Sequence, residues 1–101
     1  MQQVTIIGLG LIGGSIGMAL KRWSAANGNA LRVIGYDADM DKQNLAKSKG
    51  AVDGTAWNLG EAVKNADVVV LATPVGAMKE LFEDIAPSLK VGAIVTDTGS
   101  T

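Results

Sequence analysis

The chain has 101 residues, of which 48% are hydrophobic and 19% are charged, a composition that indicates one globular domain over residues 1–101 and excludes a disordered segment. Nine basic and ten acidic residues give a net charge of −1, and the absence of a basic run predicts no binding to nucleic acid or to an anionic membrane surface. The sequence contains neither cysteine nor histidine, which excludes disulfides and the usual zinc ligands and fits a cytoplasmic location.

The first 20 residues carry no charged side chain and have the hydropathy of a membrane segment. However, Lys21 and Arg22 follow this apolar stretch, whereas a signal peptide carries its basic residues before it. Its glycines would each cost a membrane-spanning helix about 1 kcal/mol relative to alanine. We therefore expect no association with a membrane.

Residues 4–17 predict a strand, a glycine turn and the start of a helix. Gly8, Gly10 and Gly13 have the G-x-G-x-x-G spacing of a dinucleotide-binding turn. In such a turn the first glycine allows a sharp bend, the second leaves room for a pyrophosphate, and the third lets the helix pack close to the sheet. The first helical turn adds unpaired amides and a positive dipole end. The candidate cofactor-binding residues are Gly8, Gly10, Leu11, Ile12 and Gly13.

Strands and helices alternate along the remaining chain. Strands are expected at 3–7, 31–36, 55–57, 68–72 and 93–96, and helices at 11–26, 40–49, 59–65 and 76–86. This alternation predicts an α/β fold, a Rossmann-type doubly wound parallel sheet with strand order 3-2-1-4-5 that stops before a sixth strand.

Apolar residues at helical spacing indicate which helix faces are buried. We expect the first helix to face the sheet through Ile12, Ile16, Ala19, Leu20 and Trp23. For Trp23, near the end of that helix, contact with a partner is the alternative to covering the core. Met78, Phe82 and Ile85 of the last helix are expected to lie in the core of the domain. Trp57 is expected to make ordinary packing contacts, the alternative being that it flanks an adenine ring.

Asp37 ends the second predicted strand, 24 residues after Gly13. In the predicted fold an acidic residue at this point accepts hydrogen bonds from the adenosine ribose, and it would repel the additional phosphate of NADP. The usual spacing is about 20 residues, and the polar stretch 24–30 accounts for the difference as a longer loop. Asp37 therefore predicts NAD as the cofactor, the alternative being a simple turn aspartate.

Thr73, Pro74 and Val75 end the fourth predicted strand, beside the crevice where the strand order reverses. Ligands bind at such a crevice, so these three residues are predicted to line the nicotinamide ribose. The alternative is that Pro74 only separates the strand from the following helix.

Asp37, Asp39 and Asp41 imitate the start of a calcium-binding loop. The pattern then fails, because Lys42 stands at the glycine position and Ser48 at the position of the bidentate glutamate. We therefore expect no metal site.

Four blocks of sequence resemble the nucleotide-binding domain of the prephenate/arogenate dehydrogenase family. They are GLGLIGGS at 8–15, GYD at 35–37, VVLATPV at 69–75 and DTGS at 97–100. The resemblance implies an oxidoreductase of tyrosine biosynthesis, which oxidatively decarboxylates prephenate or arogenate with NAD or NADP as hydride acceptor. It also implies that Ser100, as the serine of the Asp-x-Gly-Ser motif, positions the substrate and a catalytic histidine.

That histidine, and the helical domain for substrate binding and dimerisation, lie downstream in the family and are absent from these residues. We therefore expect this chain to bind NAD without turning over alone, and to form a homodimer only together with the further domain. A stand-alone NAD(H)-sensing regulatory domain is the alternative, because the glycine turn and Asp37 serve both functions. The blocks at 73–75 and 97–100 favour the enzyme.

Overall fold

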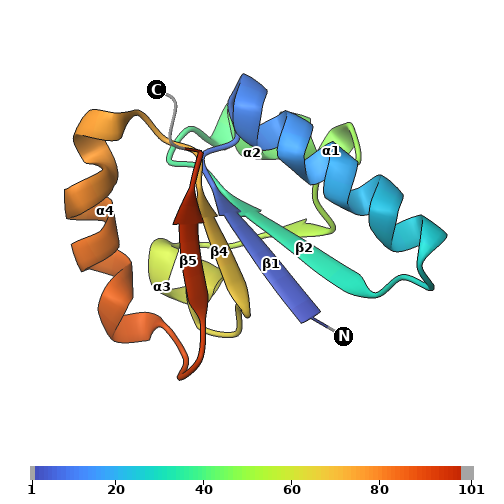
Figure 1. Cartoon of the computed structure of the whole chain (residues 1–101). Coiled ribbons are helices and arrows are strands. Elements are labelled where there is room, and N and C mark those ends of the chain that lie inside the picture. Colours follow the sequence, from blue (N-terminus) through green and yellow to red (C-terminus); the bar gives the residue numbers. More distant parts are fainter. Residues whose placement is uncertain (1, 99–101) are drawn as a thin grey trace.

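The computed structural model describes residues 2–98 as a sheet with helices on both faces (Figure 1). Five parallel strands have the order β3-β2-β1-β4-β5, which confirms the predicted Rossmann-type fold. The elements are β1 (Gln2–Ile7), α1 (Leu11–Ala26), β2 (Leu31–Tyr36), α2 (Met40–Ser48), β3 (Gly54–Thr55), α3 (Leu59–Val63), β4 (Val68–Leu71), α4 (Met78–Ile85) and β5 (Ile94–Asp97), with short 3-10 turns η1 (Val75–Ala77) and η2 (Ala86–Ser88) on either side of α4.

The three central strands end at the same edge of the sheet. Ile7, the last residue of β1, is paired with Tyr36 of β2 and with Leu71 of β4. The loops that follow these strands therefore start side by side, and they carry the glycine turn, Asp37 and Thr73.

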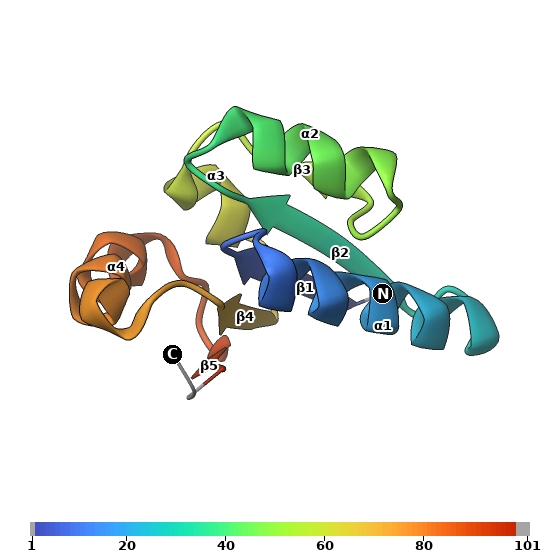
Figure 2. The same cartoon turned by 90° about the horizontal axis from the view of Figure 1, so that it is seen from above.

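Helices α1 and α2 cover one face of the sheet, and α3 and α4 cover the other (Figure 2). Successive strand residues point to opposite faces, so Ile6 belongs to the core under α1 and α2, whereas Ile7 belongs to the core under α3 and α4. Because both faces are covered at the centre of the sheet, β1, β2 and β4 are mostly apolar without alternation, as expected for a parallel sheet, whereas the edge strand β5 is mostly exposed.

Helix α1 approaches the sheet through glycines. A Cβ atom on Gly13 would lie 1.9 Å from the carbonyl oxygen of Gly8, and one on Gly17 would lie 2.3 Å from the carbonyl oxygen of Ala51. Both distances are far below a van der Waals contact. The close approach of α1 to the turn after β1 and to the segment between α2 and β3 therefore depends on two positions without a side chain.

The predicted sheet-facing side of α1 is correct in part. Ile16 and Leu20 do pack against the core. The other three residues do not face the sheet as expected, because α1 is rotated about its axis so that Gly13 and Gly17 point inward. The exposed residues are Ile12, Ala19 and Trp23.

Two aromatic side chains also depart from the expected packing. Trp57 is 94% exposed, so the packing expected for its side chain is wrong. Strand β3 is only two residues long and ends at Thr55, so Trp57 lies beyond it. Phe82 is 47% exposed, whereas Ile85 in the same helix is fully buried. Met78 packs against the core from α4 as expected, and Leu81 does so as well.

Candidate functional site

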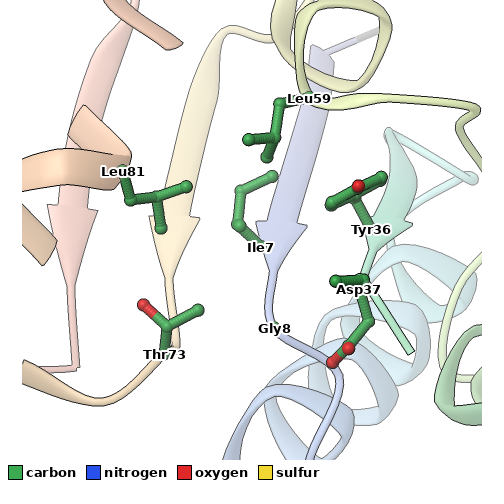
Figure 3. A pocket seen from close by; sticks show the side chains of 8 residues that line it. Ile7, Gly8, Tyr36, Asp37, Leu59, Thr73 and Leu81 are labelled. Carbon is green, nitrogen blue, oxygen red and sulfur yellow. The ribbon is translucent and has the colours of Figure 1, made fainter. Parts of the chain in front are cut away.

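Three of the predicted site residues line one cavity at the carboxyl edge of the sheet. The cavity has a volume of about 230 Å³, and Gly8, Asp37 and Thr73 contribute to its wall (Figure 3). Five further residues that the sequence analysis did not single out complete the lining. They are Ile7, Tyr36, Ala38, Leu59 and Leu81.

The sequence does not distinguish the residues of α3 and α4 that line the cavity from ordinary core residues. Leu59 and Leu81 occupy apolar positions and partly pack against the buried cluster under their helices. Their side chains also face the cavity, which makes one wall of it apolar (Figure 3). A hydrophobic pattern predicts that a residue is buried, but it does not show whether a ligand or a neighbouring side chain covers that residue.

Gly8 joins the glycine turn to the loop after β4. Its φ of +100° lies in the left-handed region, which favours glycine. A Cβ atom there would lie 2.8 Å from the carbonyl oxygen of Ala72 and 3.1 Å from the Cγ2 atom of Thr73. The two loops that border the crevice are thus in direct contact, and only glycine fits between them.

The amino end of α1 is open. Gly10 is the N-cap and makes no side-chain capping hydrogen bond, and the first turn contains no acidic residue. A Cβ atom on Gly10 would meet no described atom within 4 Å, and Leu11 is 89% exposed. Backbone amides and a positive dipole end without a carboxylate cap suit an anionic phosphate.

Gly10 and Leu11 do not line the cavity that contains Asp37. They line a neighbouring groove of about 360 Å³ between α1 and α2. The glycine turn therefore lies between two hollows, with Gly8 facing one and Gly10 facing the other.

The Asp37 carboxylate is held by backbone amides. Its Oδ2 atom accepts a hydrogen bond from the amide of Leu9 (2.8 Å), and its Oδ1 atom accepts one from the amide of Asp39 (2.8 Å). A second bond between the loops, from the amide of Gly8 to the carbonyl oxygen of Tyr36 (2.8 Å), lies beside the first. A carboxylate has about four acceptor positions, so about two remain for the hydroxyls of a ligand.

Two of the remaining predicted residues, Pro74 and Val75, directly follow Thr73 in the chain. Pro74 is exposed and is not among the residues that line the cavity with Thr73, and Val75 begins the turn η1. Ser100 lies outside the described residues.

Two carboxylates with lowered pKa lie away from the cavity. Hydrogen bonds from Lys90 and from the amide of Gln3 lower the pKa of Asp67. Burial raises the pKa of Asp53, but hydrogen bonds from Lys21 and a backbone amide, together with nearby positive charge, outweigh this effect and lower it. These carboxylates bind strand amides and lysines of this chain, so we assign them a structural role.

A search of residues 2–98 finds no cluster of three or more His, Cys, Asp or Glu side chains arranged to hold a metal ion. In the same part of the chain, no helix has the length and hydropathy needed to cross a membrane.

Known proteins share both the sequence and the fold. The family described as "Prephenate dehydrogenase, nucleotide-binding domain" matches residues 16–101. Prephenate dehydrogenase of Lactococcus lactis is 35% identical to this chain in an alignment 102 residues long, which covers 100% of this chain and 27% of that protein. Arogenate dehydrogenase of Synechocystis superposes with a TM-score of 0.86 at 28% identity, over 99% of this chain and 34% of that one.

A prephenate dehydrogenase from A. aeolicus, solved in complex with hydroxyphenyl propionate and NAD+, also has a TM-score of 0.86, at 30% identity over 100% of this chain and 34% of that one. The chain thus spans about a quarter to a third of the length of these relatives. The family match begins at residue 16, after the glycine turn, and so does not depend on that motif. The chain belongs to the prephenate dehydrogenase family, as its nucleotide-binding domain.

Proposed function

We propose that this chain binds NAD and thereby supplies the hydride acceptor of a prephenate or arogenate dehydrogenase. The observation that carries the proposal is the Asp37 carboxylate, which is fixed against the glycine turn and faces a cavity. An acidic residue at this position of a Rossmann fold binds the adenosine ribose. The A. aeolicus relative, solved with NAD+, supports the same cofactor.

The residues around Asp37 fit the parts of a dinucleotide. The apolar wall formed by Leu59 and Leu81 suits an adenine ring. The open space at Gly10, with the uncapped amino end of α1, suits a pyrophosphate. The assignments are Asp37 for the adenosine ribose, Gly10, Leu11 and Ile12 for the pyrophosphate, Gly8 and Gly13 for the shape of the turn, and Thr73, Pro74 and Val75 for the nicotinamide ribose.

Asp37 also provides the basis for choosing NAD over NADP. The 2′-phosphate of NADP would replace a hydroxyl donor that the carboxylate binds, and would place two negative charges together. Losing the hydrogen bonds and adding this repulsion costs about 2–4 kcal/mol, which corresponds to a preference for NAD of about 30- to 1,000-fold.

Bound NAD supplies only the acceptor for the hydride. The reaction also needs a base for the substrate hydroxyl, and the chain has no histidine. Ser100 would position the substrate and the base, but a serine hydroxyl is too weakly basic to replace that base. We expect no NADH from this chain with NAD and either prephenate or arogenate. The base, the substrate pocket and a homodimer contact would come from a further domain of a cytoplasmic enzyme.

Calorimetric titration of the 101-residue chain with NAD and with NADP tests the cofactor assignment. In the Asp37→Asn variant one side-chain oxygen still accepts a backbone hydrogen bond, but the negative charge is gone. We expect the preference for NAD to shrink at least about tenfold, because the repulsion of the 2′-phosphate is lost.

Asp39→Asn is the matched control. Asp39 lies two residues further on and caps α2 through the amide of Asp41, and asparagine caps a helix equally well. This variant should keep the preference of the unmodified chain. Equal affinities for NAD and NADP in the unmodified chain would refute the assignment of Asp37, and failure to bind either would refute the cofactor role.

A further inference from the structure

Gln43 is a buried polar side chain at the base of the Asp37 loop. It lies in α2 and is only 2% exposed, although glutamine is seldom buried unless its polar atoms are paired. Its Oε1 atom accepts a hydrogen bond from the backbone amide of Asp37 (3.0 Å), and its Nε2 atom lies 3.7 Å from the sulfur of Met40. The side chain thus connects the body of α2 to the end of β2.

This contact acts on Asp37 at the point where the sheet no longer holds the chain. The last pair between β1 and β2 joins Ile7 to Tyr36, so the amide of Asp37 lies one residue beyond the ladder. Gln43 binds that amide, while the carboxylate of the same residue binds the amides of Leu9 and Asp39. The backbone of Asp37 is therefore held by α2, and its side chain is held both by the N-cap residue of α2 and by the glycine turn.

We infer that Gln43 is a positioning residue for nucleotide selectivity. By holding the amide of Asp37 it places the carboxylate where it binds the ribose hydroxyls and repels a 2′-phosphate. Without the Gln43 acceptor, the amide of Asp37 must turn to find another partner, and the carboxylate turns with it. This inference rests on the proposed binding of NAD.

A set of three variants separates positioning from stability. Gln43→Met keeps the length of the side chain and removes the acceptor. Gln43→Glu keeps an oxygen acceptor in either protonation state. Ala46→Gly, also buried in α2, destabilises the helix without touching Asp37. For each variant, calorimetry gives the Kd for NAD and for NADP, and thermal unfolding gives the stability.

We expect Gln43→Met to lower the ratio of the NADP and NAD dissociation constants about tenfold, because a carboxylate that has turned loses about one hydrogen bond to the ribose hydroxyls of NAD. Gln43→Glu should not lower the ratio, because it keeps the acceptor and any negative charge it carries adds to the repulsion of the 2′-phosphate. Ala46→Gly should lower the Tm while leaving the ratio unchanged. A Gln43→Met protein with a lower Tm and the original ratio would overturn the inference, because Gln43 would then serve stability alone.

A further variant and the unmodified chain allow the inference to be tested in every case. If Gln43→Met does not fold, Gln43→Asn withdraws the same acceptor by one methylene, and an unchanged ratio in that variant would equally overturn the inference. If the unmodified chain binds neither nucleotide or does not discriminate between them, the proposed function fails before Gln43 is tested. The two failures are therefore distinguishable.

Discussion

Replacing Gly13 by alanine should destabilise this protein although it adds only a methyl group. The new carbon would lie 1.9 Å from the carbonyl oxygen and 3.0 Å from the carbonyl carbon of Gly8. This neighbour is backbone, and its own amide is hydrogen-bonded to the carbonyl oxygen of Tyr36, so it cannot yield as the end of a flexible side chain would. Helix α1 must instead move away from the sheet.

The magnitude follows from two opposing effects. Overpacking a close contact costs about 1–3 kcal/mol, and this contact against backbone belongs at the upper end of that range. Alanine in a helix is favoured over glycine by about 0.5–1 kcal/mol, so the net loss is about 2 kcal/mol. For a domain of this size such a loss lowers the Tm by about 8 °C or more.

The neighbouring Gly14 is the matched control. A Cβ atom on Gly14 would meet no described atom within 4 Å, so Gly14→Ala retains only the gain in helix propensity and should raise the Tm by a few degrees. Thermal unfolding followed by circular dichroism measures both variants under the same conditions. A Gly13→Ala protein that melts at or above the unmodified chain, or two variants that shift together, would refute the reasoning from the close contact.

Two further predictions concern cofactor binding and acid. Gly10→Val should leave the protein folded, because its Cβ atom enters open space, with a small loss of Tm because valine is a poorer N-cap than glycine. It should weaken NAD binding more than about tenfold by occupying the space of the pyrophosphate; retained affinity in calorimetry would place the pyrophosphate elsewhere. Asp67 and Asp53 have a pKa below the ordinary value of 3.8, so the stability they contribute is present above that pH and is lost as the pH falls below it. Asp67→Asn should flatten this loss in urea titrations between about pH 5 and pH 2, and an unchanged pH slope would contradict the structural role of Asp67.

The parts of the fold that the sequence predicts are those set by local pattern. The alternation of strands and helices leads to the observed strand order, and the spacing of Gly8 and Gly13 places the turn correctly. The buried face of α1 is predicted only in part. Hydrophobic periodicity follows apolar side chains, whereas α1 packs most closely at Gly13 and Gly17, which have no side chain. The exposure of Trp57 likewise depends on β3 ending early, which composition does not reveal.

The site follows the same division. The position of Asp37 after an apolar strand is visible in the sequence, but its bond to the amide of Leu9 joins segments that are far apart along the chain. Gln43 occupies a helix of mostly exposed residues and has the composition of a solvent-facing position. In the fold its Oε1 atom binds the amide of Asp37 at the end of β2, a tertiary contact that the hydrophobic pattern does not encode.

The two faces of the sheet draw on different halves of the chain, and this has a consequence for synthesis on the ribosome. The core under α1 and α2 consists of buried residues between Ile6 and Val52, whereas the core under α3 and α4 needs residues 62–85 to enclose Ile7. At about 5–20 residues per second, the first face precedes the second by about two to seven seconds. During that interval the growing chain exposes an apolar sheet surface suited to capture by a chaperone.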